Sequence, residues 1–403
     1  MSNKAGVKKV KGAETVGLVP RLRFPEFRGA GEWELASLGK ICKRITNGKA
    51  NSEDHEDGGV YPLFDRSALI KRSNKCAFEA EAVIIPGEGM RFQPRYFRGA
   101  FNLHQRAYAL MDHSGDARFV YYIIDRYKDA LAMKAVQSTV LSLRLPIIEK
   151  FAVCVPQLKE QQKIADCLSS LDEVITLESQ KLEALKVHKN GLMQQLFPAE
   201  GETVPRLRFP EFRGAGGWEL KDLEKICDIN PPNTGLPDTF YYIDLESVEA
   251  GELKTKKKMS RDNAPSRAQR VLQNGDVIYQ SVRPYQKNNW FCVFNDDENY
   301  VASTGYAQLR AYNSKEFLYQ IVHCDDFVGR VIAQCTGSNY PAINSSDLAK
   351  IQVAIPRHKE QQKIADCLSF LDEVITLESQ KLDMLKTHKK GLMQQLFPKL
   401  EEV

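Results

Sequence analysis

The sequence predicts an α/β protein of mixed α+β character, in which two globular domains are separated by two long antiparallel coiled-coil helices. Three observations predict this fold. A short motif occurs twice along the 403 residues, and a longer block with a coiled-coil period also occurs twice. Two dissimilar segments between these repeats show the same order of expected strands and helices. The chain therefore has an internal pseudo-twofold repeat.

The repeats form a nearly constant framework around variable inserts. The short motif, Val19–Leu35, returns as Val204–Leu220 with one difference in its 17 positions. The long block, Pro156–Pro198, returns as Pro356–Pro398 with seven differences in 43 positions. Drift after a duplication would have blurred the framework as much as the inserts. We infer that the framework does one job twice, while the inserts do two different jobs.

These repeats divide the chain into segments. The N-terminal stretch carries several lysines without an apolar run, so we expect a disordered tail rather than a signal peptide. The expected segments are the tail at 1–18, a first domain at 19–155 containing the short motif at 19–35, the first long helix at 156–198, a second domain at 204–355 containing the short motif at 204–220, and the second long helix at 356–398.

The long block predicts a helix that pairs with its own copy. Leu158–Leu196 spans 39 residues, about 58 Å at 1.5 Å per residue. Apolar residues alternate at spacings of four and three, and a stripe of that length must be buried. An antiparallel pair is favoured, with packing of each helix on its own domain as the alternative. The expected pairing residues are Ile164, Leu168, Leu171, Ile175, Leu182 and Leu185, with Ile364, Leu368, Leu371, Ile375, Leu382 and Leu385 in the second copy.

The two inserts predict one fold with different surfaces. Each has a buried strand that runs into a loop, a helical stretch, and a short apolar strand that ends at a proline. The expected strands are 82–86, 276–280, 151–155 and 351–355, and the expected helical stretches are 119–134 and 315–334.

Each insert also contains a basic stretch with interleaved amides and aromatic rings. Lys and Arg neutralise phosphates, whereas Arg reads guanine and Asn or Gln reads adenine through paired hydrogen bonds. One such stretch is weak evidence, but one in each insert favours duplex DNA. The candidate residues are Arg91, Gln93, Arg95, Arg98, Gln105 and Arg106 in the first insert, and Lys256, Lys257, Lys258, Arg261, Arg267, Arg270, Gln280, Arg283, Tyr285, Gln286 and Lys287 in the second.

Other classes of function find little support in the sequence. The net charge is only +4, no run of about 18 apolar residues predicts a membrane span, and the nine cysteines form no C-x-x-C pair. The sequence contains no G-x-x-x-x-G-K-[ST] phosphate loop. Asn230–Asn233 lacks the aromatic ring of the N-P-P-aromatic motif of adenine methyltransferases. Asp238 with Glu252 and Lys254 fits a nuclease pattern in one half only. We expect no catalytic residue and no metal site.

The framework resembles the conserved region of type I restriction–modification specificity subunits. The resemblance is carried by Val153–Pro156 with Glu160–Ala165, Leu168 and Leu171-Asp172, by the second copy at 353–372, and by Gly275–Ile278 and Gly337-Ser338. It implies a non-catalytic cytoplasmic subunit whose two target-recognition domains each read half of a bipartite DNA site, with the helices setting the spacer. It also implies double-stranded DNA, two methyltransferase subunits and two restriction/translocase subunits as partners.

The resemblance places S-adenosylmethionine, ATP and Mg in the partner subunits and no cofactor in this chain. Adenine-N6 methylation and ATP-dependent cleavage would then belong to the complex. The competing hypothesis is a self-contained, internally duplicated DNA endonuclease or adenine methyltransferase.

Overall fold

The computed structural model describes residues 18–137, 140–337 and 340–399. Nearly all of the expected tail at 1–18, and Ser338 of the Gly337-Ser338 motif, lie outside these described residues.

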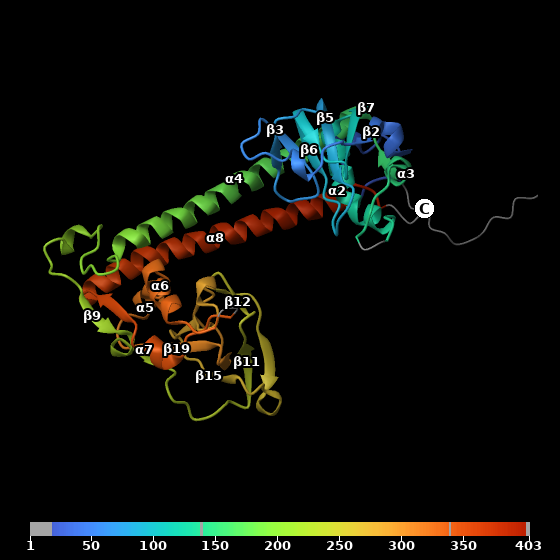
Figure 1. The fold of residues 1–403 in the computed structure, drawn as a ribbon. Helices are drawn as coiled ribbons and strands as arrows, with labels where there is room; N and C mark the ends of the chain where they lie inside the picture. Colours follow the sequence, from blue (N-terminus) through green and yellow to red (C-terminus); the bar gives the residue numbers. More distant parts are fainter. Residues whose placement is uncertain (1–17, 138–139, 338–339, 400–403) are drawn as a thin grey trace, which may run out of the picture. The chain divides into compact units, whose positions relative to one another are not determined.

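The chain forms two compact units (Figure 1). Unit 1 contains the chain up to Ser179 together with Gln380 onward, and unit 2 contains Gln180–Ser379. Each long helix is therefore divided between the two units. The division expected from the sequence, with the helices as separate segments, does not coincide with these units.

Unit 1 contains the first variable segment and parts of both long helices. Its elements are β1 (Glu34–Ser37), α1 (Leu38–Ile41), β2 (Cys42–Asn47), β3 (Tyr61–Phe64), β4 (Lys71–Ser73), β5 (Phe78–Pro86), β6 (Arg95–Leu103), β7 (Ala107–His113), α2 (Ala117–Met133), α3 (Leu145–Lys150), β8 (Ala152–Val155), the first part of α4 (Leu158–Leu196) and the last part of α8 (His358–Leu396).

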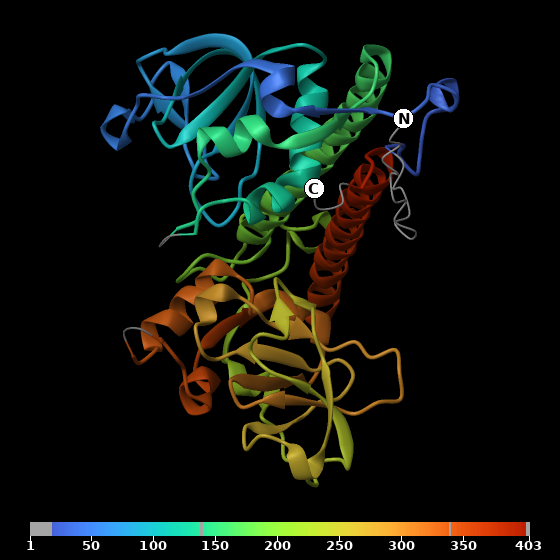
Figure 2. The ribbon, with the colours of Figure 1, turned by 90° about the vertical axis from the view of Figure 1, so that its right-hand side faces the viewer.

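The main sheet of unit 1 has the strand order β2-β7-β5-β6-β3-β4. The expected strand at 82–86 is the C-terminal part of β5, which pairs antiparallel with both β6 and β7. One face of the sheet packs on α2, which contributes Phe119, Ile123 and Tyr127 to the core. Figure 2 shows α2 in teal beside the green first turns of α4. The variable segment thus packs directly on the beginning of its own long helix.

Unit 2 contains the second variable segment. Its elements are β9 (Glu219–Asp222), β10 (Cys227–Ile229), β11 (Thr239–Ile243), β12 (Val248–Glu249), β13 (Glu252–Leu253), β14 (Lys257–Ser260), β15 (Ala268–Val271), β16 (Val277–Gln280), β17 (Trp290–Phe291), β18 (Tyr300–Ser303), β19 (Tyr306–Ala311), α5 (Lys315–Ile321), α6 (Asp325–Gln334), α7 (Ser345–Ala349), β20 (Gln352–Ile355) and the remaining parts of α4 and α8.

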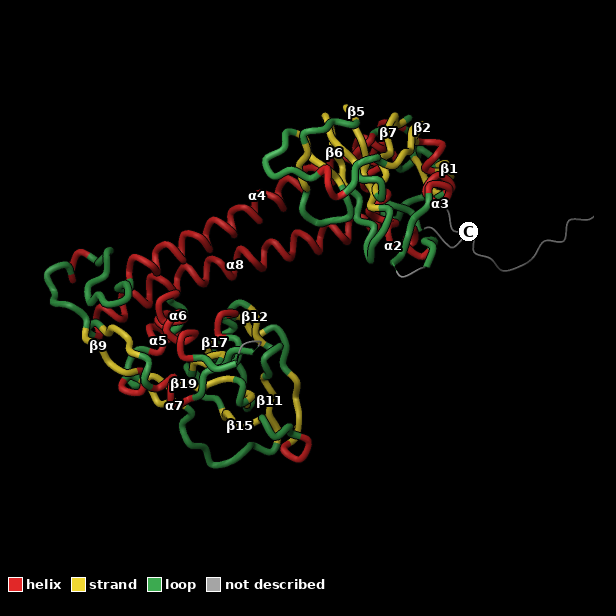
Figure 3. Tube along the Cα trace, viewed as in Figure 1, coloured by secondary structure: helices red, strands yellow, loops and turns green. Residues whose placement is uncertain are grey.

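Two sheets form the body of unit 2, with strand orders β10-β19-β16-β17 and β14-β11-β18-β15. Figure 3 shows the helices α5 and α6 in red against the yellow strands. The prediction of one helical stretch over 315–334 is wrong in one respect, because the structure has two helices there, α5 and α6. At the break, the carbonyl of His323 accepts a hydrogen bond from Lys287 Nζ at 3.0 Å, from outside the helix. That contact depends on the tertiary fold.

Within each unit, the two long helices run antiparallel. In unit 1, Lys389 pairs with Asp172 and Lys381 pairs with Glu178, both at 2.5 Å. In unit 2, the same positions of the other copies are used: Lys189 pairs with Asp372 at 2.5 Å, and Lys181 pairs with Glu378. In both units, moving toward the C-terminus of one helix means moving toward the N-terminus of the other. This is the antiparallel arrangement that the repeat predicts. All twelve expected pairing residues are buried or partly buried.

The beginning of the seam has a second role. Ile164 and Leu168 are at most 2% exposed and belong to the core of unit 1, together with Trp33 and Phe119 of the domain. Their copies Ile364 and Leu368 take the same place in unit 2. Pairing of the helices and packing of each helix on its own domain were weighed as alternatives, and the structure shows both.

The last turn of each long helix enters the core of the domain that belongs to the other repeat. Phe397, at the end of α8, packs edge-on against Trp33 with ring centroids 6.1 Å apart and lies 5.6 Å from Phe119. In unit 2, Phe197 at the end of α4 lies 6.0 Å from Trp218 and 5.6 Å from Phe317. The core of each domain therefore includes residues from the long helix of the other repeat as well as its own.

A buried ion pair fixes each short motif to the long helix that follows it. Arg23 donates to both oxygens of Glu160, at 2.7 Å each, and the side chains are 7% and 1% exposed. The Trp33 indole donates to the same carboxylate at 3.3 Å. The hydrogen bonds to Glu160 raise the pKa of Arg23 above its ordinary value. Arg208, Glu360 and Trp218 repeat these contacts at the same distances in unit 2, which explains why the short motif must match the long block.

The crossed cores make a testable prediction. Phe397→Ala should destabilise unit 1 by about 3–5 kcal/mol, because it leaves a cavity against Trp33 and Phe119. Unfolding followed by the fluorescence of Trp33, in a background with Trp218 and Trp290 changed to Phe, measures it. Phe370→Ala is the matched control, since Phe370 is 64% exposed. An unfolding transition of Trp33 that Phe397→Ala leaves unchanged would contradict the arrangement.

Candidate nucleic-acid interface

The basic candidates of unit 1 fall into two groups. Arg91, Arg98, Gln105 and Arg106 are exposed, and only Arg106 among them has a side-chain ion pair, with Glu88 at 2.9 Å, within the described residues. These four side chains are available to DNA. Arg106 is also close to the loop after β5, because its carbonyl accepts from the amide of Gly87 at 2.8 Å.

The other two candidates of unit 1 are occupied by the protein itself. Arg95 donates from Nη2 to the carbonyls of Ser67 and Ala68, the latter at 2.8 Å, so it holds the loop between β3 and β4. Gln93 donates to Asp125 and accepts from Lys128, each at 2.7 Å. Their contacts favour a structural role over the base contact that their residue type predicts.

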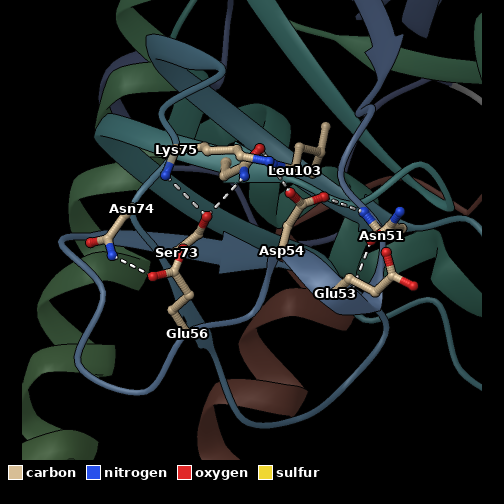
Figure 4. A network of polar contacts seen from close by, with 9 residues as sticks. Asn51, Glu53, Asp54, Glu56, Ser73, Asn74, Lys75 and Leu103 are labelled. Carbon is tan, nitrogen blue, oxygen red and sulfur yellow. Dashed lines mark hydrogen bonds and ion pairs between the residues drawn. The ribbon is translucent and has the colours of Figure 1, made fainter.

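An acidic loop marks a part of unit 1 that is unsuited to phosphates (Figure 4). Between β2 and β3, Asp54 accepts from the amide of Asn51 at 2.9 Å and pairs with Lys75 at 2.6 Å. Glu56 accepts from Asn74 at 2.5 Å. These contacts fix the carboxylates on the surface, and the pairing with Lys75 holds the pKa of Asp54 below its ordinary value. Glu53, Glu56 and Asp57 have no lysine or arginine partner among the described residues, and their negative charge repels the DNA backbone.

Lys256, which precedes β14, and Lys257 and Lys258 of β14 differ in how their charges are used. Lys256 lies beside Tyr300 and Asp296, at 2.7 and 3.2 Å, and above the ring of Tyr241. Lys258 pairs with Glu298 at 2.5 Å. Lys257, which lies between them, is exposed and has no ion pair among the described residues. Of the three, Lys257 is the one with an uncompensated charge.

The arginines beyond β14 are also unequal. Arg261 pairs with Asp238 at 2.7 Å, and Arg267 is exposed. Arg270 is partly buried, and burial lowers its pKa below the ordinary value. Its Nε is buried without a hydrogen-bond partner among the described residues.

The loop after β16 holds the remaining candidates in a strained backbone. Arg283 and Lys287 both adopt left-handed conformations, with φ of 56° and 54°, which cost a non-glycine residue about 1–2 kcal/mol each. Such strain persists only where surrounding contacts impose it. The amide of Arg283 donates to the carbonyl of Pro341 at 2.7 Å, and Lys287 Nζ pairs with Asp325 at 2.5 Å. Tyr285 is 51% exposed.

Gln280 supports this loop from below and is not free to read a base. It is 2% exposed, and its amide donates to Gln286 at 2.8 Å. The sequence-based assignment of Gln280 to DNA contact therefore requires correction, because the side chain is used inside the protein. The same bond occupies the oxygen of Gln286.

A neutral histidine lies beneath the same loop. Burial lowers the pKa of His323 to about 4, so its ring stays uncharged at neutral pH. Its Nδ1 is 2.7 Å from the carbonyl of Tyr319, so this nitrogen carries the proton and donates. Nε2 is then the acceptor for the side-chain amide nitrogen of Asn289, at 3.3 Å. The side-chain oxygen of Asn289 accepts from the backbone N–H of Gln280 at 2.7 Å. The end of β16 and α5 are joined by this chain of bonds.

The Gly275–Ile278 motif has a structural role in unit 2, because Asp276 is buried and bonded to the neighbouring strand. Its carboxylate is 1% exposed and accepts two bonds from Arg310, each 2.8 Å, and one from Gln308 at 2.7 Å. These bonds fix the start of β16, and therefore the position at which its loop emerges. Arg310 was not among the sequence candidates.

Sequence reasoning also missed Tyr340. The Arg283 guanidinium lies over its ring, 4.3 Å from the centroid, and Tyr340 is 63% exposed. The two residues are 57 positions apart, so no local pattern joins them. An aromatic residue following Gly337 was the available signal.

The residues of the rejected catalytic patterns have other contacts. Asn230 donates to Ser345 at 2.7 Å and accepts from the amide of Gln308 at 2.9 Å. Asp238 pairs with Arg261, whereas Glu252 pairs with Lys254. Among the described residues, no group of three or more His, Cys, Asp or Glu side chains is arranged to hold a metal ion. No helix in the same part of the chain is long and apolar enough to cross a membrane.

Comparisons with known proteins agree with this organisation. The family model described as the type I restriction modification DNA specificity domain matches twice, over residues 30–187 and 216–387. The EcoDI type I restriction enzyme specificity subunit of Escherichia coli is 22% identical over 366 residues, covering 83% of this chain and 80% of that protein. The MjaVIII specificity subunit of Methanocaldococcus jannaschii is 22% identical over 400 residues, covering 92% of each.

A solved structure shares the fold. The type I restriction–modification S subunit from M. genitalium superposes with a TM-score of 0.65 at 16% identity, covering 95% of this chain and 100% of that one. The two family matches each include one variable segment and most of one long helix. This chain belongs to the type I restriction–modification DNA specificity family and is a specificity subunit with two specificity domains.

Proposed function

We propose that this subunit directs a type I restriction–modification complex to a bipartite DNA site, with each unit reading one half-site. The observation that carries the proposal is the twofold occurrence of a DNA specificity domain on a framework whose copies are almost identical, while the inserts differ. A duplicated enzyme would need two competent active sites. The residues that fit catalytic patterns in one half are used in ion pairs and hydrogen bonds instead.

Contacts to phosphate and contacts to bases are expected from different residues. Lys257 of unit 2 and the exposed Arg98 of unit 1 suit phosphates, since they carry charge without fixed orientation. The loop after β16 suits base edges, since its backbone is fixed by the contacts of Arg283 and Lys287. Base recognition needs such fixed positions.

The long helices are proposed to set the spacer between the half-sites. Each helix is continuous over 39 residues, about 58 Å. A continuous helix has a fixed length and rotation per residue, so it transmits both to the recognition surfaces.

An apolar stripe on the outer face of the helices is the proposed docking surface for modification subunits. In unit 1, Leu177 of α4 and Met384 of α8 are 64% and 65% exposed. In unit 2, Phe370 and Leu377 of α8 are each 64% exposed. Exposed apolar residues that recur at helical spacing mark a protein interface. Two modification subunits, one for each unit, and two restriction subunits would complete the complex.

No cofactor is proposed for this chain itself. S-adenosylmethionine, ATP and Mg would be bound by the partner subunits, because the sequence contains no phosphate loop and no complete methyltransferase motif. We propose that the complex acts in the cytoplasm, where chromosomal DNA is accessible.

The unequal lysines of β14 give a prediction about salt. Lys257→Ala should weaken binding to all DNA sequences alike and reduce the slope of log affinity against log salt by about one. Lys258→Ala is the matched control, and its effect should be smaller because Glu298 already compensates that charge. Salt titrations with cognate and unrelated duplexes measure both. A change in sequence preference for Lys257→Ala would count against a phosphate contact.

The exchange of an insert gives a prediction about specificity. Replacing 36–155 by the corresponding segment of a relative should change one half-site and leave the other half-site and the framework contacts intact. Methylome sequencing of cells that produce the complex reads both half-sites at once. The reciprocal exchange of 221–355 should change the other half-site. Loss of both half-sites from one exchange, in a folded protein, would refute separate reading.

The apolar stripe gives a prediction about assembly. Leu177→Asp with Met384→Asp should prevent the binding of a modification subunit to unit 1, because both charges would be buried in the interface. The subunit alone should keep its stability, since both positions are exposed. Glu183→Gln, also exposed on α4, is the control. The mass of the purified complex measures assembly, and an unchanged mass would place the docking surface elsewhere.

A further inference from the structure

The two units contain the same loop frame at the end of one strand. In unit 1, Gly87 and Gly89 follow β5; in unit 2, Ser281 and Arg283 follow β16. Three backbone hydrogen bonds recur at equivalent places in the two units. In unit 1 they run from Gly87 N to Arg106 O (2.8 Å), from Gly89 N to Leu141 O (3.1 Å) and from Leu143 N to Gly87 O (2.8 Å). In unit 2 they run from Ser281 N to Gly305 O (3.0 Å), from Arg283 N to Pro341 O (2.7 Å) and from Ile343 N to Ser281 O (3.0 Å).

A small ladder closes the frame in both units. Val136 and Ser142 exchange two backbone hydrogen bonds in unit 1, and Thr336 and Ala342 exchange two in unit 2. In each unit, three segments are therefore held together in the same way. They are the loop that begins at Gly87 or Ser281, the turn that contains Arg106 or Gly305, and the loop that contains Leu141 or Pro341. We call the described residues of these three segments the recognition frame.

The side chains on this frame differ at matching positions. Gly89 corresponds to Arg283, Met90 to Pro284, Arg91 to Tyr285, Arg106 to Gly305 and Val140 to Tyr340, as the shared hydrogen bonds align them. Met90 is 84% exposed, and Tyr285 and Tyr340 are 51% and 63% exposed. A constant backbone with different exposed side chains is the arrangement expected of an element that selects the target.

Within the frame of unit 2, Arg283 and Tyr340 form a pair. The guanidinium lies 4.3 Å from the centre of the ring, and the backbone of Arg283 is fixed to that of Pro341, next to Tyr340. Arg283 has no ion-pair partner within the described part of the chain, whereas Lys256, Lys258 and Lys287 each pair with a carboxylate. Stacking on a ring holds the plane of a guanidinium and leaves its hydrogen-bond donors unused.

We propose that the recognition frame is where each unit reads bases, and that Arg283, supported by Tyr340, contacts a guanine in the half-site of unit 2. This inference rests on the proposed function. A guanidinium with fixed plane donates two parallel hydrogen bonds to O6 and N7 of guanine, an arrangement that no other base offers in the major groove. Unit 1 has Gly89 at the equivalent position, so its frame must read its half-site with other side chains, among them Arg106.

The test uses the full chain produced with its modification subunits, and reads the methylated sequences of the host genome. Arg283→Ala should reduce discrimination at one base pair of one half-site by about five- to hundred-fold, with the other half-site unchanged. Arg283→Gln should move the preference at that position from guanine toward adenine, since Gln pairs with N6 and N7 of adenine. Tyr340→Phe should keep the specificity and Tyr340→Ala should reduce it at the same position. Arg213→Ala, an exposed basic residue of unit 2 outside the candidate DNA contacts, is the control and should leave all preferences unchanged.

Each outcome decides the inference. If the methylated consensus of a complex with Arg283→Ala is unchanged at every base pair, Arg283 does not read a base. If it methylates nothing, binding of the purified complex to duplexes that differ by one base pair decides: lost discrimination at one guanine supports the inference, and equal weakening on all duplexes overturns it. If the unaltered complex methylates no bipartite sequence, the proposed function fails and the inference with it, which distinguishes the two failures.

Discussion

The last turn of each long helix fills a hydrophobic core that the other repeat begins. Phe397 lies against Trp33 and Phe119, and Phe197 lies against Trp218 and Phe317 with nearly the same geometry. A helix can reach that core only if it runs antiparallel to its copy and in a fixed register. The buried pair of Arg23 with Glu160, repeated by Arg208 with Glu360, then fixes each short motif to its helix. The core of each domain therefore includes residues of both repeats, so the position of each helix end is tied to the packing of the other repeat's domain.

A constant framework allows the surfaces to vary. The backbone hydrogen bonds at the ends of β5 and β16 are equivalent, although the residues that they present differ at almost every position. In unit 2, the polar groups beneath the loop, Gln280, Asn289 and His323, are bonded to one another or to the backbone. The loop is thus supported by side chains that cannot themselves reach DNA. The exposed layer is the one proposed to confer specificity, and the hydrogen bonds of the layer below fix the backbone that presents it.

The sequence was sufficient for the periodic elements and insufficient for contacts between distant residues. The repeat and the four-three spacing predicted both helices with bounds of Leu158–Leu196 in the first copy, as α4 has them. The interruption between α5 and α6 was not predicted, and the carbonyl of His323 at the break bonds to Lys287, a residue distant in sequence. Residue type alone also placed Gln280 on the DNA-binding surface, although it is buried. Tyr340 was missed since its partner, Arg283, is distant in sequence.

The charges along the helix seam determine which orientation two such helices can adopt. In the antiparallel pair, Lys189 meets Asp372 and Lys389 meets Asp172. A parallel pair in register would place Lys189 opposite Lys389 and Glu178 opposite Glu378, and partly buried like charges repel strongly. The apolar seam itself is indifferent to direction, because its residues match in both copies. Electrostatic repulsion therefore disfavours the parallel alternative, and any two copies of this helix, from one chain or from two, should associate in the antiparallel orientation.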